Sequence, residues 1–209
     1  MAAAAAEWPR PESGHFELFV AKAACKFNAA HFIAHPDGYR ERMHGHNYRA
    51  EITVKGRQGW ALGEDGYLLD FGSVKKALKA SCAELDETFL CPAKCAATVV
   101  TQLGAEGEVV PLAPGRWDGR GTLRIVVKHD GAEFTMPRSD AIVLPLEQAS
   151  AELLAWYICC RTLERLGGPA ALWAQGAESL RVGVVETEHQ EASFTLPLRP
   201  GGAVATAGS

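Results

Sequence analysis

Three histidines in two neighbouring stretches have the residue type and spacing of a metal site. His44 and His46 are separated by one glycine, and because side chains alternate along a strand, they point the same way if strand geometry continues through Gly45. His31 ends the preceding apolar stretch and can meet them across a sheet. Three converging imidazoles are typical of catalytic zinc, whose fourth position is open to water or substrate. The alternative is ordinary strand histidines, because His-x-His spacing is common. The other four histidines, His15, His35, His129 and His189, are interpreted as surface or loop residues.

Two alternating stretches must position these histidines. Residues 16–33 are predicted to be a strand whose odd-numbered side chains, from Phe19 to Ile33, share one face. Residues 46–55 alternate more regularly and are predicted to be a half-buried antiparallel strand. Its predicted inward side chains are Tyr48, Ala50, Ile52 and Val54.

Helical periods and closing strands complete the predicted domain. The remaining predicted elements are helices at 71–85 and 150–166 and strands at 179–187 and 192–198. Asp70 or Ser73 can cap the first helix, and Gly167, Gly168 and Pro169 end the second. The order predicts an α+β fold in which a small antiparallel sheet carries two helices on one face.

The segment between the two helices is predicted to be an insertion. Residues 96–145 are rich in Gly and Pro, lack a helical period and contain Asp130-Gly131 between two alternating runs, which predicts a hairpin with a two-residue turn. The insertion is therefore predicted to be mostly β. The expected domain organisation is a loose head at 1–15, one domain at 16–199 and a disordered tail at 200–209.

Composition narrows the class of partner. The chain has 209 residues, 47% of them hydrophobic, and a formal net charge of −4 without a run of Lys or Arg. Nucleic acid and anionic membranes are therefore poor partners, and a small molecule is favoured. No basic, long apolar leader or membrane-spanning stretch is recognised, so the cytoplasm is the expected compartment. The six cysteines lack paired zinc spacing and are predicted to be reduced, mostly buried thiols.

Several short motifs occur in an order that resembles one known family. The motifs are Phe27-Asn28-Ala29-Ala30-His31, His44-Gly45-His46-Asn47-Tyr48, Gly66-Tyr67-Leu68-Leu69-Asp70-Phe71, Leu85-Asp86, Ser150-Ala151-Glu152 and Val185-Glu186-Thr187. Together they resemble the 6-pyruvoyltetrahydropterin synthases and their relatives. Each motif is weak alone, but the series spans the domain outside the insertion.

The resemblance implies a fold, a metal and an assembly. It implies a T-fold, in which a four-stranded antiparallel sheet is backed by two helices in the order ββααββ, and zinc held by His31, His44 and His46. It also implies that Glu186 anchors a pterin ring, with Ser150 and Thr187 in the substrate-binding motifs. Trimers that stack into a homohexamer are implied as well, and pairing between copies would satisfy the bare edges of such a sheet.

Two departures from the family pattern change the expected chemistry. The family's cysteine base is missing, because no cysteine lies between Cys25 and Cys82. Glu41 instead resembles the glutamate of a family variant that cleaves the substrate's side chain for folate synthesis. An exposed Glu41 in a basic turn is the alternative, and the flanking arginines could attract a triphosphate. The family's usual Asp-His pair is here Asp86-Glu87.

The sequence leaves several functions open. The first is a zinc-dependent lyase that converts 7,8-dihydroneopterin triphosphate to 6-hydroxymethyl-7,8-dihydropterin, with Glu41 as base and Asp86 or Glu87 as second proton carrier. The second is 6-pyruvoyltetrahydropterin synthase activity in tetrahydrobiopterin synthesis, which the missing cysteine disfavours. The third is a non-catalytic pterin-binding protein. A carboxytetrahydropterin synthase of queuosine synthesis is a weaker alternative, because it too would normally use the cysteine and the Asp-His pair.

Overall fold

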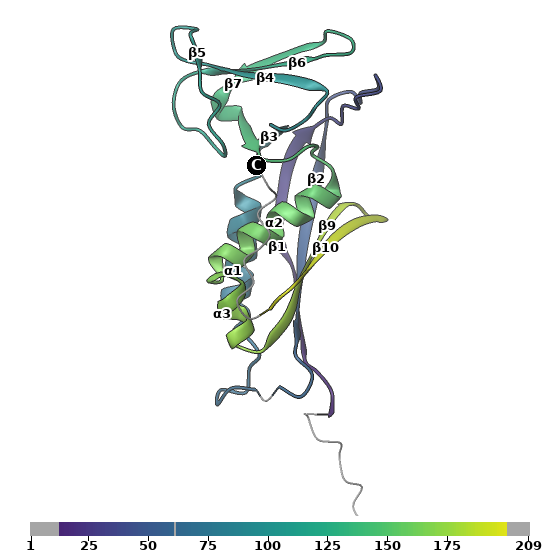
Figure 1. The fold of residues 1–209 in the computed structure, drawn as a ribbon, viewed down its shortest axis with the longest axis vertical. Coiled ribbons are helices and arrows are strands. Elements are labelled where there is room, and N and C mark those ends of the chain that lie inside the picture. The colour runs from purple at the N-terminus through teal and green to yellow at the C-terminus, as the bar shows by residue number, and fades with distance from the viewer. Residues whose placement is uncertain (1–12, 61, 200–209) are drawn as a thin grey trace, which may run out of the picture.

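Two sheets form the framework of the chain in the computed structural model, which describes residues 13–60 and 62–199 (Figure 1). The strands are β1 (Glu17–His31), β2 (His44–Gly56), β3 (Thr88–Pro92), β4 (Thr98–Leu103), β5 (Val109–Val110), β6 (Thr122–Val127), β7 (Glu133–Pro137), β8 (Ala141–Leu144), β9 (Ala177–Thr187) and β10 (Gln190–Pro197). The helices are α1 (Phe71–Ala83), α2 (Ala151–Arg165) and α3 (Gly168–Ala174). Most of the predicted loose head and all of the predicted disordered tail lie outside the described residues.

The larger sheet contains the predicted strands and two more. Its order is β10-β9-β2-β1-β3-β8, and the first four strands are antiparallel, as predicted. The prediction of four strands is incomplete, because β3 pairs with β1 and β8 with β3, both in parallel. Both added strands are short and buried on all sides, so they have no alternation for a sequence pattern to detect.

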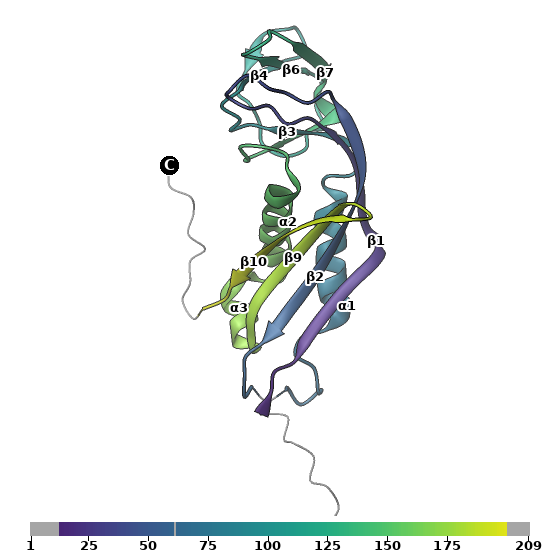
Figure 2. The ribbon, with the colours of Figure 1, turned by 90° about the vertical axis from the view of Figure 1, so that its right-hand side faces the viewer.

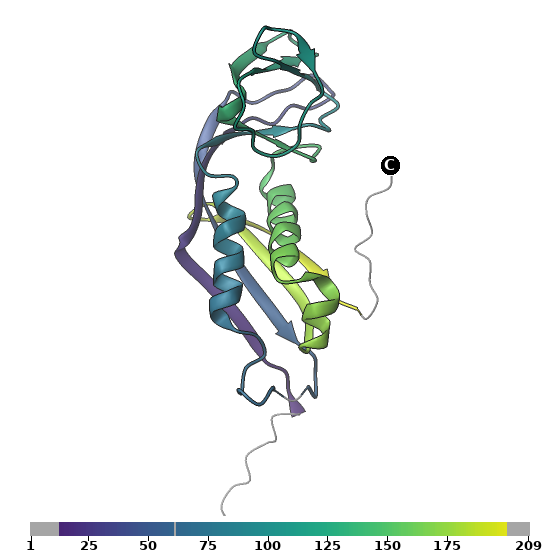
Figure 3. The same cartoon turned by 90° about the vertical axis from the view of Figure 1, so that its left-hand side faces the viewer.

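The helices cover one face of this sheet, as Figures 2 and 3 show from opposite sides. Both predicted helices are confirmed, and the Asp70 side chain accepts hydrogen bonds from the backbone N–H groups of Gly72 and Ser73 at the start of α1. The sequence analysis missed α3. Gly167 and Gly168 have positive φ angles and end α2, but Pro169 then sits in the first turn of a new helix.

The predicted inward face of β1 is right only for its second half. Cys25, Phe27, Ala29 and His31 are buried, whereas Phe19 is 53% exposed. Between Ala21, which pairs with Glu51, and Lys26, which pairs with Arg49, the register shifts by three residues. An odd shift exchanges the two faces of a strand, so Leu18 and Val20 are the inward residues of the first half.

The insertion folds as a second sheet at one end of the first (Figure 1). Its order is β5-β4-β6-β7, which confirms the predicted β structure and hairpin. The turn is longer than predicted, because Gly131 N–H donates to Val127 O, four residues earlier. β8 lies within the predicted insertion but pairs in the larger sheet. The fully buried Arg138 donates to the Gln102 side chain and to the carbonyl oxygens of Ala113, Gly115 and Ala141.

Two further features of the fold are the burial of the cysteines and the character of the helices. Five of the six cysteines are buried, as predicted, and Cys82, Cys91, Cys95, Cys159 and Cys160 are free thiols. Among the described residues, no helix is both long and apolar enough to cross a membrane.

Candidate metal and catalytic site

The three histidines converge at one end of the paired strands β1 and β2. His31 and His44 are direct cross-strand partners, and His46 follows on the same face of β2. The ring centroids are 4.6 Å apart for His31 and His44 and 4.9 Å apart for His44 and His46. One ligand nitrogen from each of the three lies within 4.8 Å of the others. The geometry expected from the His-x-His spacing is therefore present.

Backbone carbonyl groups orient two of these imidazoles. His31 Nδ1 donates to Ala149 O, and His44 Nδ1 donates to Arg42 O, each at 2.8 Å, which leaves Nε2 of both rings as a lone-pair donor. Burial lowers the pKa of His31 below its ordinary value, although its bond to Ala149 opposes this shift, so the ring is neutral at pH 7. The neutral His31 ring and the oriented His44 ring fit a transition metal, zinc included, without selecting one metal.

Tyr48 and Glu186 lie directly against the histidines. The Tyr48 hydroxyl donates to Glu186 Oε1 at 3.1 Å and lies 3.2 Å from His31 Nε2. Glu186 Oε1 is 3.3 Å from His46 Nε2. Burial first, and then the charge of Glu186, raise the pKa of Tyr48, so its hydroxyl stays protonated and keeps donating. Glu186 faces the same side as the buried Val182 and Val184.

Glu41 shares a cavity with the metal-site histidines. The cavity has a volume of about 470 Å³, within the range of small-molecule sites. Its walls include Ser150 and Glu152 at the start of α2, together with Glu41 and Glu186. Glu41 Oε2 accepts the backbone N–H of Ile33 at 3.1 Å, which fixes the carboxylate at the cavity wall.

Asp86, Glu87 and Thr187 lie elsewhere in a single copy of the chain. Asp86 Oδ1 accepts from the backbone N–H of Asn28 at 2.8 Å, and the N–H of Glu87 donates to Asn28 O. Glu87 lines a separate hollow and has a φ of 56°, which is unusual for a residue other than glycine. Thr187 does not line the cavity itself, but its hydroxyl donates to Oε1 of Gln190, which does.

The sequence analysis missed two contributors to the site. Tyr48 was identified only as an inward strand residue, although its spacing from His44 and His46 already places it on their face. His189 was interpreted as an ordinary loop histidine, but it lines the cavity from the turn between β9 and β10. The position of His189, three residues after Glu186 and in the turn of a hairpin, could have indicated that it lies near the site.

The sequence matches a known family over most of its length. The family model described as "6-pyruvoyl tetrahydropterin synthase" matches residues 21–196. A protein of Methanocaldococcus jannaschii, provisionally named 6-carboxy-5,6,7,8-tetrahydropterin synthase, is 28% identical over 72% of this chain and 78% of its own. A Pyrococcus abyssi protein with the same provisional name is 24% identical over 85% of this chain and 90% of its own.

Solved structures share the fold. The 6-pyruvoyl tetrahydropterin synthase of Plasmodium falciparum superposes with a TM-score of 0.75 and 26% identity, over 88% of this chain and 99% of its own. A Plasmodium vivax structure, at a TM-score of 0.73 and 25% identity over the same shares, carries a glutamate-to-alanine substitution of a residue described as catalytic. The likeness confirms the T-fold. Members of this family are lyases that act on pterins. With the family model matching from residue 21 to residue 196, the chain belongs to the 6-pyruvoyl tetrahydropterin synthase family.

Proposed function

We propose that the protein is a zinc-dependent lyase that converts 7,8-dihydroneopterin triphosphate to 6-hydroxymethyl-7,8-dihydropterin for folate synthesis. The observation that carries this proposal is the position of Glu41, whose carboxylate lines the same cavity as the three histidines. The described catalytic glutamate of the Plasmodium vivax relative also supports a carboxylate in this role.

The proposed reaction needs an acidified hydroxyl, a base and a proton donor. When bound by His31, His44 and His46, zinc supplies Lewis acidity to the substrate's side-chain hydroxyls. Glu41 removes the proton from the C2′ hydroxyl, and the C1′–C2′ bond breaks with its electron pair moving into the pterin ring, while C2′ leaves as the carbonyl carbon of an aldehyde that carries the triphosphate. A protonated carboxyl then returns a proton to C1′.

The proposed pterin anchor is Glu186. Its Oε1 accepts the Tyr48 hydroxyl, and Oε2 is available for an N–H of the ring. Ser150 lies across the same cavity at the start of α2. Thr187 follows the anchor in the chain and contributes through the turn that it closes with Gln190.

We also propose a homohexamer, built as a dimer of trimers, in the cytoplasm. Among residues 13–60 and 62–199, β10 pairs only with β9, and the first half of β1 pairs only with β2, so both present open edges. Glu87 lines a different hollow from Glu41, and Asp86 precedes it in the same turn, so they serve as second proton carriers for a site in a neighbouring copy. The five free thiols at Cys82, Cys91, Cys95, Cys159 and Cys160 fit a reducing compartment. Sedimentation analysis measures the assembly.

A second candidate follows from the archaeal relatives, which are provisionally named 6-carboxy-5,6,7,8-tetrahydropterin synthases. No cysteine lies between Cys25 and Cys82, and this disfavours the 6-carboxytetrahydropterin synthase reaction. The 6-pyruvoyltetrahydropterin synthase reaction is disfavoured for the same reason. A non-catalytic pterin-binding protein is the remaining alternative.

The deciding experiment identifies the product. Zinc-loaded protein is incubated with 7,8-dihydroneopterin triphosphate, and the pterin is identified by mass after mild oxidation. A 6-hydroxymethyl product with turnover lowered about 10²- to 10⁴-fold in Glu41→Gln supports the proposal. Glu178→Gln, which breaks a surface ion pair with Lys55, is the matched control.

Other outcomes contradict the proposal. Unchanged turnover in Glu41→Gln removes the proposed base. A pyruvoyl or carboxy product assigns the chain to one of the other reactions, and bound pterin without turnover identifies a binding protein.

A further inference from the structure

The insertion contacts the segment that carries Glu41 through one arginine. Arg40 Nε donates to Asp130 Oδ2 at 2.7 Å, in the turn between β6 and β7. The Arg40 guanidinium also lies over the Phe134 ring, 5.5 Å from its centroid, and donates through Nη1 to Glu41 O at 3.2 Å. A single side chain therefore connects the backbone of Glu41 to the hairpin of the second sheet.

The same segment has little support of its own. Residues 32–43 connect β1 to β2, and their internal pairing includes an isolated bridge between Ala34 and Arg40 and two hydrogen bonds between Glu41 and Ile33. The tip of the segment packs on the hairpin as well, because a Cβ on Gly38 would lie 2.8 Å from His129 Nδ1. Gln148, outside the insertion, fixes Ala34 through two hydrogen bonds, so the insertion determines the position of the segment mainly at residues 38–41.

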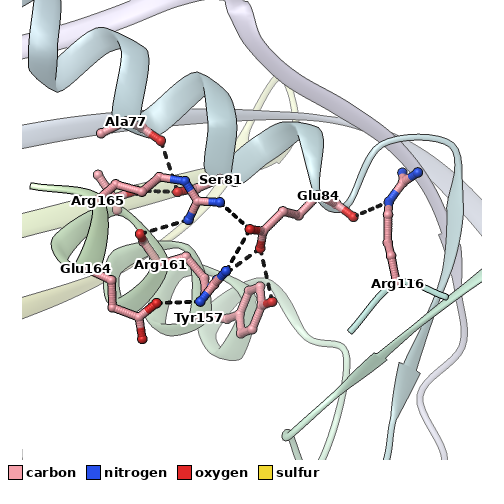
Figure 4. Close-up of polar contacts among 9 residues, drawn as sticks. Ala77, Ser81, Glu84, Arg116, Tyr157, Arg161, Glu164 and Arg165 are labelled. Carbon is pink, nitrogen blue, oxygen red and sulfur yellow. Dashed lines mark hydrogen bonds and ion pairs between the residues drawn. The ribbon is translucent and has the colours of Figure 1, made fainter. Parts of the chain in front are cut away.

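The insertion also holds the turn that carries Asp86 and Glu87. Arg116 Nε donates to Glu84 O at 2.8 Å, as Figure 4 shows, and its Nη2 donates to Asp86 O. The residue before Arg116 is fixed from two sides. Gly115 exchanges two backbone hydrogen bonds with Val143 of β8, and its carbonyl also accepts from the buried Arg138.

We propose that the insertion is a brace for the acid–base groups, in which Asp130 is a positioning residue that acts through Arg40 on Glu41. The inference rests on the proposed function of Glu41. A reacting carboxylate must be held to within about 0.5 Å, and a displacement of about 1 Å can cost on the order of 100-fold in rate. Asp130 is itself fixed, because its Oδ1 accepts the backbone N–H of Ala132.

The charge of Asp130 and the partial exposure of the Arg40–Asp130 pair distinguish a positioning role from a general contribution to the stability of the fold. Hydrogen bonds from Ala132 and Arg40 lower the pKa of Asp130, so the carboxylate stays charged at the pH of an assay. The side chains of Arg40 and Asp130 remain 25% and 33% exposed, and ion pairs of this kind add little to global stability. Loss of the pair should therefore move Glu41 more than it destabilises the fold.

The test compares two ion pairs of one hairpin. Asp130→Asn removes the partner of Arg40. The control, Glu133→Gln, breaks the ion pair between Glu133 and Arg124 in the same sheet, where the two atoms are 2.6 Å apart. This control pair makes no hydrogen bond or ion pair with residues 32–43. Asp130→Asn is expected to speed amide hydrogen exchange in residues 33–43 and to lower kcat about tenfold with KM nearly unchanged. Metal content should stay at the wild-type level, and Asp130→Glu should restore part of the loss. Glu133→Gln should change neither exchange in this segment nor kcat.

Two results overturn the inference. One is exchange in residues 33–43 that rises no more in Asp130→Asn than in Glu133→Gln. The other is faster exchange with unchanged kcat. A wild-type protein without turnover refutes the proposed function instead, and exchange then still decides whether the insertion braces the segment. Arg116→Gln, with exchange measured in residues 84–88, tests the second contact independently of Asp130.

Discussion

The histidines and the acidic groups of the candidate site are supported in different ways. His31, His44 and His46 are on β1 and β2, whose cross-strand register fixes them, and two of the rings are also bonded to backbone carbonyl groups. Glu41, Asp86 and Glu87 are on connections between elements, and side chains of the insertion hold those connections. Metal binding should therefore tolerate changes in the insertion, whereas proton transfer should not.

The largest effect on metal affinity and turnover is expected when one of the three histidines on β1 and β2 is replaced. His44→Ala removes one of three nitrogens, so metal affinity should fall more than the roughly 10- to 100-fold typical of losing an outer partner, and turnover should fall to background. Metal titration followed by activity measurement checks this. His15→Ala, at an exposed histidine outside the cluster, should match the wild type. Full metal affinity in His44→Ala would contradict the proposal that the three histidines on β1 and β2 bind the metal.

A large loss of stability is expected when the buried arginine of the insertion, Arg138, is replaced. Arg138→Met removes the hydrogen bonds to four acceptors in a buried site, of which Gln102 Oε1 and Gly115 O keep another donor, so the free energy of unfolding should fall by about 3–5 kcal/mol. Denaturant unfolding of the metal-free protein measures it. Arg124→Met, at an exposed ion pair in the same sheet, should cost about 1 kcal/mol or less. Metal affinity of folded Arg138→Met should remain near that of the wild type, and a parallel loss would show that the two regions are not independent.

The smallest effect is expected where α1 meets α2, at the turn that carries Asp86. Burial opposes ionisation of Glu84, but bonds and charges from Arg161 and Arg165 outweigh it and lower its pKa (Figure 4). The carboxylate therefore stabilises the fold above pH 4.5, and this contribution is lost as the pH falls through the lower folded pKa. Glu84→Gln should reduce the free energy of unfolding by about 1 kcal/mol at neutral pH and by less below pH 4.5.

A neighbouring glutamate provides the control for that measurement. Glu164 also pairs with Arg161, but its side chain is 62% exposed, against 23% for Glu84. Glu164→Gln should therefore change the free energy of unfolding by about 0.5 kcal/mol or less. Equal losses in the two variants, measured by denaturant unfolding at both pH values, would show that the buried network adds nothing beyond a surface pair.

Much of the fold was predictable because its long elements have clear periods. The strand at 46–55 and the helices at 71–85 and 150–166 have one buried face each, and the structure confirms all three. The bulge in β1 was not predictable, because Ala21, Ala23 and Ala24 fit either face. Pairing of β3 and β8 was not predictable either, since it joins short apolar runs that are distant in sequence.

The sequence by itself determined the histidine cluster, because alternation along one strand and its apposition to the next are local properties. It also gave Glu41 and Glu186 as candidate site residues, the first through resemblance and the second also through the face that it shares with Val182 and Val184. Only the tertiary structure decided that Glu41 lines the cavity of all three histidines while Asp86 and Glu87 do not, and that the insertion contacts both connections. Those relations depend on how distant segments pack, and a connecting loop has no period that encodes its position.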